Sequence, residues 1–239
     1  MNNSRLADII LRGAEDSGLI LPKQAGLLFQ TYYDFLGERG KRVNLTAIEG
    51  EVDVARLHFL DSLALLKTRG FSGARVIDVG SGAGFPGVPL KIAEPSIELT
   101  LLDASGKRVA FLTELCSKLG IRADCVHERA EEAARRHDMR ESYDIALSRA
   151  VAELSVLCEL CLPFVRPGGD FIAMKGAGSD NEVIDARNAI ETLCAELVDC
   201  VDYAVPGTDV IHRAVIIRKT GETPEKYPRR FARISSRPL

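Results

Sequence analysis

The apolar residues at the start of the chain recur with the spacing of α-helices. In the stretch 22–37 they fall at positions i, i+3, i+4, i+7 and i+11, which places them on one face of a helix: Ala25, Leu28, Phe29, Tyr32 and Leu36. Pro22 suits the first turn of such a helix, and Gly37 with Gly40 suits its end. Similar patterns predict helices over 4–17 and about 51–67. We therefore expect an N-terminal helical segment at 1–70.

From residue 75 onward the spacing changes to that of short β-strands. Seven runs rich in β-branched and apolar residues follow one another, at 75–79, 97–102, 121–126, 143–148, 169–174, 197–205 and 211–218. Helical stretches separate the first six runs, a pattern typical of a parallel sheet with helices on both faces. The last two runs are joined only by PGTD (206–209), which is too short for a parallel crossover and predicts an antiparallel hairpin.

These patterns predict an α/β fold, a doubly wound seven-stranded sheet with an antiparallel last strand and an N-terminal helical extension. The chain divides into the helical segment 1–70, a ligand-binding domain 71–220 and a tail 221–239. The whole chain has a formal net charge of −3, yet seven Lys and Arg stand against two Asp and Glu from Arg218 to Leu239. The tail is thus a basic segment on an acidic chain, which makes it the candidate for contact with a polyanion.

Composition excludes several classes of protein. No apolar run approaches the roughly 18 residues of a membrane span, and the first residues carry acids and lack the apolar core of a secretory signal. The cysteines lie in apolar stretches, which is typical of reduced, buried thiols in a cytoplasmic protein. Cys158-x-x-Cys161 has no second pair of ligands at a suitable spacing, so we expect no metal site. We expect a cytoplasmic monomer without membrane contact.

The turn after the first predicted strand, VIDVGSGAGFPG (76–87), carries the most informative motif. The pattern G-x-G-x-x-G (82–87) matches the dinucleotide fingerprint, and G-x-G-x-G (80–84) matches the turn of S-adenosylmethionine (SAM) enzymes equally well. Pro86 removes a backbone donor where a pyrophosphate would need one. An acid at Asp78 would repel a pyrophosphate but suits the amino group of SAM through a bound water. Both residues favour a nucleoside ligand without phosphates.

Asp103, at the end of the second predicted strand, supports nucleoside binding. A carboxylate there accepts two hydrogen bonds from a ribose diol, about 20 residues past the glycine turn. The alternative is a structural role, in which Asp103 or Ser105 caps the following helix. Since NAD and SAM both carry the diol, an NAD-dependent oxidoreductase stays open as an alternative at this point.

Several stretches of the sequence become informative when they are taken together. They are RVIDVGSGAGFPGVPL, LLDASGKRVAFL, NLTAI, HFLDSL, LSRAVAEL, MKG and TPEKYPRR with the final RPL. This combination resembles the RsmG family, formerly called glucose-inhibited division protein B (GidB), from about residue 25 to the C-terminus. The resemblance implies the Rossmann-like fold of class I SAM-dependent methyltransferases, SAM as cofactor, and methylation of a guanine N7 in 16S ribosomal RNA of the small subunit. The tail departs from many relatives, since Phe231-Ala232 stands where they have Ala-Gly.

The resemblance also implies residues of a SAM site, all of them after predicted strands. The glycine turn would contact SAM, the residues after the second strand would hold its ribose and adenine edge, and ERAEEA would lie beside the adenine. The residue in LSRAV would line the pocket between methyl donor and RNA base. These cofactor-binding positions are Gly80, Phe85, Asp103, Ala104, Ser105, Ala130, Glu131 and Arg149.

The chemistry of N7 methylation asks mainly for alignment. Guanine N7 exposes a lone pair at neutral pH, so no general base is needed, and positioning supplies much of the rate. Arg149 and Lys175 are the catalytic candidates. Their structural alternatives are an ion pair of Arg149 with Asp144 or Glu153, and a Lys175 that caps the carboxyl end of a helix. His58 either pairs with Asp61 along a helix or frames the cofactor mouth with Asn44.

Basic residues with neighbouring aromatic rings mark the expected RNA contact. The RNA-binding candidates are Lys175, Arg213, Lys226, Arg229 and Arg230, with Tyr227 and Phe231 suited to stacking and further basic pairs at 41–42, 107–108 and 135–136. The alternative for the tail is a solvated, partly disordered end. The expected partner is 16S ribosomal RNA or the small ribosomal subunit. A non-catalytic RNA-binding factor of ribosome assembly remains the second alternative function.

Overall fold

The computed structural model describes residues 5–39 and 50–239, so the predictions for Lys41, Arg42 and Asn44 concern residues outside the described range. The helical elements are α1 (Arg5–Asp16), α2 (Ala25–Arg39), α3 (Glu51–Val54), η2 (Ala55–Leu60), α4 (Asp61–Leu63), η3 (Ala64–Lys67), α5 (Gly87–Ala93), α6 (Gly106–Leu119), α7 (Ala130–Ala133), α8 (Leu154–Cys161), η4 (Leu162–Phe164), α9 (Asp180–Asp185), α10 (Arg187–Thr192) and α11 (Phe231–Ser236). The strands are β1 (Arg75–Val79), β2 (Glu98–Asp103), β3 (Ala123–His127), β4 (Tyr143–Arg149), β5 (Val165–Gly176), β6 (Ala195–Ala204) and β7 (Ile211–Lys219).

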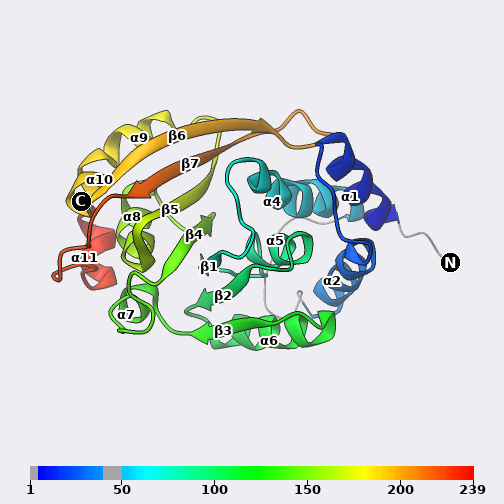
Figure 1. Cartoon of the computed structure of the whole chain (residues 1–239), viewed down its shortest axis with the longest axis horizontal. Coiled ribbons are helices and arrows are strands. Elements are labelled where there is room, and N and C mark those ends of the chain that lie inside the picture. Colours follow the sequence, from blue (N-terminus) through cyan, green and yellow to red (C-terminus); the bar gives the residue numbers. More distant parts are fainter. Residues whose placement is uncertain (1–4, 40–49) are drawn as a thin grey trace.

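The strands form one seven-stranded sheet in the order β3-β2-β1-β4-β5-β7-β6 (Figure 1). Strands β1 to β5 pair in parallel, whereas β7 pairs antiparallel with both β5 and β6. The predicted sheet and its terminal hairpin are therefore confirmed. Strand β5 begins at Val165 rather than at 169, because the Pro-Gly-Gly stretch that resembles a turn continues the strand past an irregularity opposite β4.

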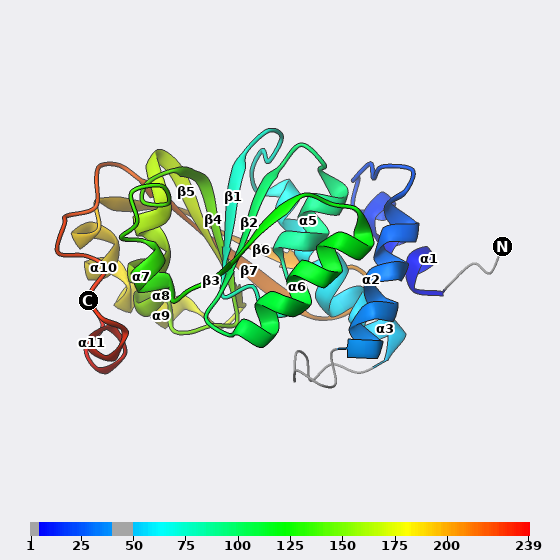
Figure 2. The same ribbon diagram turned by 90° about the horizontal axis from the view of Figure 1, so that it is seen from below.

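Alternate residues of the central strands enter two separate cores, one on each face of the sheet. On β5, Ile172 and Met174 belong to the core beneath α5, α6 and the N-terminal helices. Phe171 and Ala173 belong to the opposite core, with α8 and α10. Helices lie on both sides of the sheet in Figure 2, which agrees with strands that are apolar on both faces.

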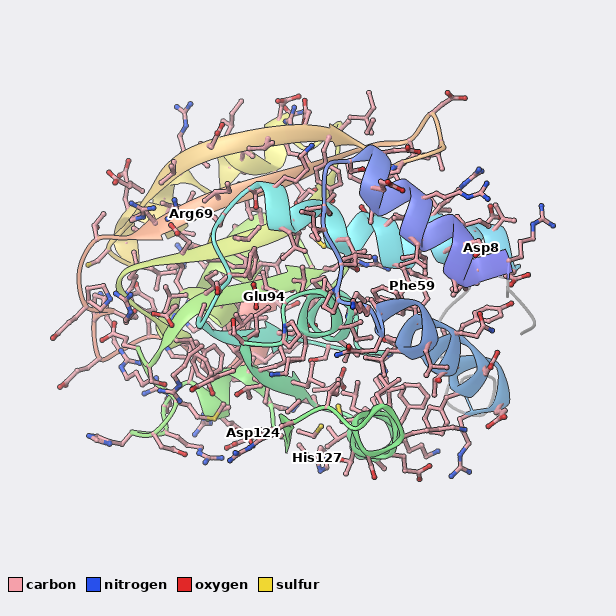
Figure 3. The ribbon with its side chains drawn as sticks, turned by 45° about the vertical axis from the view of Figure 1, so that its right-hand side comes forward. Asp8, Phe59, Arg69, Glu94, Asp124 and His127 are labelled. Carbon is pink, nitrogen blue, oxygen red and sulfur yellow. The ribbon has the colours of Figure 1, made fainter. Side chains whose placement is uncertain are left out.

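The N-terminal helices extend the first of these cores. Leu6, Phe29 and Phe59 are fully buried and share it with strand residues such as Leu101. Figure 3 labels Phe59, which lies on the helix formed by 51–67. That predicted helix is confirmed in extent, but η2 in its middle is a π-helix, a distortion that often accompanies functional sites. Among the described residues, no helix is long and apolar enough to cross a membrane.

The basic tail folds back onto α7 and α8. Its Ile234 is fully buried and Tyr227 is nearly so. Arg140 donates hydrogen bonds to the carbonyls of Thr223 and Tyr227, and Arg135 donates to the carbonyl of Pro228. The tail is therefore folded onto the protein and includes the short helix α11 (Figure 1). The alternative of a partly disordered end is wrong, while its solvated character is confirmed, since most of its residues are exposed.

Candidate functional site

Four segments of the expected site meet at one edge of the sheet. The glycine turn follows β1, Asp103 ends β2, Ala130 opens the helix after β3, and Arg149 ends β4. These strands are neighbours in the sheet and run in parallel, so their carboxyl ends lie together, at the lower side of Figure 2. Ligands of doubly wound sheets bind at this edge, near the point where the strand order reverses between β1 and β4.

The glycine turn uses backbone conformations that other residues rarely adopt. Gly80, Gly82 and Gly84 have φ angles of +76°, +58° and +102°. A Cβ at Gly84 would lie 2.7 Å from the hydroxyl oxygen of Tyr32, whereas a Cβ at Gly82 would meet only one backbone oxygen, 3.8 Å away. Gly84 is thus needed for packing inside the protein, while Gly82 leaves open space beside the turn.

Asp78 lies below this turn and is completely buried. Its Oδ2 accepts a hydrogen bond of 2.9 Å from the amide of Gly87, and its Oδ1 has no partner among the described residues. Burial raises the pKa of Asp78 to about 7, although the Gly87 amide lowers it. An unpartnered buried carboxylate oxygen at the ligand edge fits a cationic group of a ligand or the water that holds one.

The raised pKa predicts how stability depends on pH. The ordinary pKa of the side chain is 3.8 and the folded one is about 7, so the native state holds a proton at Asp78 that the unfolded chain releases. The contribution of Asp78 to the free energy of unfolding should therefore fall by about 2–4 kcal/mol as the pH rises from about 4 to about 7. We expect Asp78→Asn to remove most of this slope in urea titrations. A variant that keeps the slope of the wild-type protein would contradict the prediction.

Asp103 joins the glycine turn to the start of α6. Its Oδ2 accepts a hydrogen bond of 3.0 Å from the amide of Gly82, and its Oδ1 accepts one of 2.8 Å from the amide of Ser105. Ser105 occupies the capping position of α6 but makes no side-chain cap, so capping by its hydroxyl is wrong. The Nη1 of Arg108 also lies 3.5 Å from Oδ2, a long contact that a ribose hydroxyl can replace. A carboxylate has about four acceptor positions, so Asp103 can accept from a ribose diol when this contact is exchanged. Ala104 beside it is exposed.

Phe85 is a buried residue of the turn and is 6% exposed. Its ring stacks on Tyr32 and on His58, with centroids 5.1 Å and 4.7 Å away. The guanidinium of Arg149 lies over the same ring, 5.4 Å from its centroid. Phe85 therefore connects the turn to the N-terminal helices and to Arg149, and its predicted contact with SAM stays a prediction.

Three hydrogen bonds hold the side chain of Arg149 in place. Its Nη1 donates to Asp61 Oδ2 at 3.1 Å and to the carbonyl of Leu57 at 3.3 Å, and its Nη2 donates to His58 Nδ1. The proposed pairing with Asp144 is wrong, because Asp144 binds Arg166 and the amide of Arg75. These contacts use three of the five N–H donors of a guanidinium, so two remain for a ligand.

His58 is neutral in this arrangement. Burial and the nearby Arg149 lower its pKa to about 3, although Asp61 acts in the opposite direction. Since a guanidinium can only donate, Nδ1 of His58 must accept and the ring carries its proton on Nε2. His58 and Asp61 thus both bind Arg149, an arrangement that the sequence-based alternatives for His58 did not include.

Lys175 lies beside Arg149 at the end of β5. Its Nζ donates to the carbonyl of Ala152 and to Glu182 Oε2, both at 2.6 Å. Ala152 belongs to the loop after β4, so the alternative of a helix cap is wrong. A cavity of about 460 Å³ opens between these elements and is lined by Leu57, Asp61, Arg149, Ala150, Met174, Lys175, Gly176, Val210 and His212. It is large enough for a planar base.

Arg213 lies on β7, the strand between β5 and β6, and carboxylates already surround it. It donates to Asp202 with two nitrogens, at 2.6 Å and 3.0 Å, and to Asp180 at 2.6 Å. These hydrogen bonds raise its pKa further above its usual range. A phosphate would have to compete with two carboxylates for this guanidinium.

The tail and α7 enclose a second cavity of about 680 Å³ near the expected adenine position. It is lined by Arg129, Glu131, Glu132, Arg135, Arg229, Arg230, Phe231 and Ala232. The guanidinium of Arg129 lies 5.9 Å from the ring centroid of Phe231. Glu131 is buried, and Ala130 provides the first residue of α7.

The basic residues of the tail differ in the contacts that they make with the rest of the protein. Arg229 binds the fully buried carboxylate of Glu159, so it anchors the tail. Arg230 is exposed, and the Nζ of Lys226 lies 5.2 Å from the ring centroid of Tyr227. The pair 135–136 is also engaged, since Arg136 binds Glu128 and Asp138.

Three residues near the site were given no role there by the sequence, which named Asp61 only as a helix partner of His58. Asp61 binds Arg149, Tyr203 donates to Asp61 Oδ1 at 2.9 Å, and Arg129 lines the tail cavity. The HFLDS motif contained a signal for Asp61, because an acid within an apolar helical run needs a partner. The stretch ERAEEA (128–133) contains Arg129 without singling it out, and no signal marked Tyr203.

Solved structures of low sequence identity share this fold. A SAM-dependent methyltransferase from Aquifex aeolicus matches with a TM-score of 0.54 and 17% identity, over 77% of this chain and 98% of that chain. The [4+2]-cyclase SpnF matches with a TM-score of 0.56 and 16% identity, over 84% and 97% of the two chains. Since these two proteins are named for different activities, the fold alone does not decide the chemistry.

Sequence relatives are far closer. The protein of Alkaliphilus oremlandii named ribosomal RNA small subunit methyltransferase G is 48% identical over 98% of this chain and 99% of its own. The protein of the same name from Pelotomaculum thermopropionicum is 44% identical over 99% of this chain and 100% of its own. Residues 27–205 match the family described as rRNA small subunit methyltransferase G. The resemblance found in the sequence is thus confirmed, and the chain belongs to the rRNA small subunit methyltransferase G (GidB) family.

Proposed function

We propose that this protein transfers the methyl group of SAM to N7 of a guanine in 16S ribosomal RNA. The names of its relatives support the reaction and the RNA. The observation that carries the proposal for this chain is the meeting of two features at one sheet edge. The carboxylate of Asp103 and the carboxyl group of Asp78, which a nearby cation would help to ionise, suit a nucleoside that has a cationic group and no phosphate. The fixed guanidinium of Arg149 borders a cavity for a base.

The described residues fit SAM at four strand ends. Asp103 would accept hydrogen bonds from the ribose hydroxyls, and Asp78 would face the amino group through water. The open space beside Gly82 would receive the ligand next to the turn. The amide of Ala130, at the first position of α7, has no partner inside its helix and would meet the adenine edge. Ala104, Ser105 and Glu131 would complete the adenine side.

When bound, SAM supplies an electrophilic methyl group on its sulfonium. The protein has to align this group with N7 and needs no base, because N7 carries a free lone pair. Arg149 would bind guanine O6 through one of its two remaining N–H donors. A bidentate contact with O6 and N7 would cover the reacting atom, and the three existing contacts of the guanidinium disfavour it.

Lys175 would bind a phosphate or a base edge of the target nucleotide from the other wall of the cavity. Its ammonium has two acceptors in Ala152 and Glu182, which leaves one of three N–H donors. Arg213 contributes to RNA binding only if it exchanges a carboxylate for a phosphate. We therefore rank Lys175 above Arg213 as an RNA contact.

The tail would hold RNA next to the target nucleotide. Helix α11 lies at the same lower side of Figure 2 as the strand ends, and its cavity combines Arg129 and Arg230 with the ring of Phe231. Guanidinium groups suit phosphates, and an exposed ring suits a stacked base. Lys226 would add a weaker phosphate contact, while Arg229 keeps the cavity in shape through Glu159.

This arrangement predicts a steep salt dependence. Each phosphate contact releases counterions, so the logarithm of the RNA-binding constant should fall with the logarithm of salt concentration by about 0.7 per contact. Replacement of Arg129 and Arg230 by Ala should reduce the slope by about 1–2, measured by fluorescence anisotropy with a 16S fragment. Lys23→Ala, an exposed change on the N-terminal segment, serves as control. An unchanged slope in the double variant would contradict the role of the tail cavity.

The experiment that tests the proposed function is mass spectrometry of small-subunit RNA after incubation with the protein and methyl-labelled SAM. Naked 16S RNA and the assembled subunit are compared as substrates. Label on guanine N7 is the expected result, whereas label on an exocyclic amine or a ribose would overturn the assignment. Binding of NADH without binding of SAM would favour the oxidoreductase, and RNA binding without label would favour an assembly factor.

A further inference from the structure

The carboxylate of Asp61 connects four elements of the protein at the site. Asp61 is 1% exposed and begins α4, directly after the π-helix η2. Its Oδ2 accepts from Arg149 at the end of β4. Its Oδ1 accepts from the hydroxyl of Tyr203 at 2.9 Å and from Nδ1 of His212 at 2.7 Å, residues of β6 and β7. Tyr203 and His212 are register partners in the hairpin, so both reach the same oxygen.

We propose that Asp61 is the positioning residue for Arg149, and that it fixes the guanidinium over Phe85 by tying it to the β6–β7 hairpin. The inference rests on the proposed function only in assuming that Arg149 contacts the acceptor base. Asp61 itself borders the cavity, but its two oxygens already accept three hydrogen bonds from the protein. It therefore acts through Arg149 rather than on the substrate.

Geometry supports this assignment. The other contacts of Arg149 are a neutral imidazole, a carbonyl and the face of a ring, none of which carries a full charge. Among the described residues, Asp61 is the carboxylate that pairs with Arg149. The side chains of both are largely buried, with 2% and 16% exposed. A charge-assisted bond in such surroundings directs a planar guanidinium more strongly than neutral contacts do.

Charge balance gives Asp61 a second effect on the reaction. Methylation of N7 leaves a positive charge on the guanine ring, and the Arg149 guanidinium beside it is positive too. Paired with Asp61, that guanidinium adds no net charge to the wall of the cavity. Without the carboxylate, an uncompensated cation would oppose the charge that develops during transfer.

The decisive experiment combines Asp61→Asn with Arg149→Ala in a double-mutant cycle. We expect Asp61→Asn to lower kcat about 30-fold and to change the KM for SAM less than about threefold, because a misplaced positioning group affects the transition state. In the Arg149→Ala background, Asp61→Asn should cause less than about twofold further loss. Full multiplication of the two losses would show that Asp61 acts independently of Arg149 and would overturn the inference.

Asp170→Asn is the matched control for loss of a buried carboxylate. Asp170 is 3% exposed and binds Arg218 and Arg69, the latter labelled in Figure 3. It lies in the middle of β5, where its register partner is Ile145 near the start of β4, so it is separated from Arg149 at the end of β4. We expect it to reduce the melting temperature as Asp61→Asn does while kcat is unchanged. An equal loss of kcat in both variants would reduce Asp61 to a structural role and overturn the inference.

An NMR measurement that needs no substrate tests this inference independently of the proposed function. In protein with ¹⁵N-labelled arginine, Arg149 should give a sharp Nε–Hε signal that Asp61→Asn broadens or shifts. An unchanged signal would overturn the inference even if the activity falls. If the wild-type protein does not methylate guanine N7, the proposed function fails, while this signal still decides the positioning role. Should Asp61→Asn not fold, Tyr203→Phe, which removes one hydrogen bond to Asp61, should give about a threefold loss of kcat.

Discussion

Asp103→Ala is expected to weaken the binding of SAM about 100-fold. Hydrogen bonds to a charged group contribute about 1.5–3 kcal/mol each, and the ribose diol would lose two of them. A loss of about 3 kcal/mol corresponds to roughly two orders of magnitude in Kd. The variant also loses the link between the amides of Gly82 and Ser105, which orders both sides of the ribose site. Isothermal titration calorimetry measures the change directly.

The control for this variant is Asp124→Ala on the neighbouring strand β3. Asp124 is exposed, and its register partner is Thr100 in the middle of β2, so it lies away from the strand ends. It should leave the Kd of SAM unchanged. If Asp103→Ala binds SAM with the affinity of the wild-type protein, the carboxylate has only a structural role at the start of α6.

Arg149→Ala should reduce kcat by about 10²–10³, with a smaller effect on the affinity for SAM. Removal of one preorganised donor from a transition state costs about 2.7–4 kcal/mol, and a small displacement of a bound base adds to the loss. Arg149→Lys should recover little, because an ammonium cannot bind Asp61, His58 and Leu57 while it also faces a base. Initial rates with methyl-labelled SAM and 16S RNA give both constants.

Arg166→Ala provides the comparison for the loss of an arginine. Arg166 pairs with Asp144 near the start of β4, and its side chain is 51% exposed. We expect kcat within about twofold of the wild-type value, since exposed ion pairs contribute little. Because Arg149→Ala leaves Asp61 buried without its cation, melting curves of both variants must accompany the kinetics. Full activity of a folded Arg149→Ala variant would remove Arg149 from the mechanism.

The sheet could be predicted from the sequence because its signals are local. Strand β1 is rich in β-branched residues and ends at the glycine turn, and the short PGTD connection allows only a hairpin. The positions of Asp103 and Arg149 follow from the same logic, since residues at the ends of parallel strands share an edge. These predictions need no knowledge of which distant side chains come into contact.

The partners of the site residues could not be predicted in this way. The sequence suggested Asp144 for Arg149 because it is near in the chain, but the actual partner Asp61 is 88 positions away. Asp144 lies at the opposite end of the same strand, so a full-length strand separates the two side chains. Asp180 beside Arg213 and the buried Glu159 under Arg229 are contacts of the same kind.

The position of β7 between β5 and β6 has a consequence for the order in which the sheet is completed. Strand β6 precedes β7 in the chain, but it touches the sheet only through β7. During synthesis, residues 195–204 therefore emerge before the strand that holds them, and β5 keeps an open edge until residues 211–219 arrive. A nascent chain arrested between these strands would carry an open edge on β5 and an unpaired strand β6, so it would be prone to aggregation at this stage.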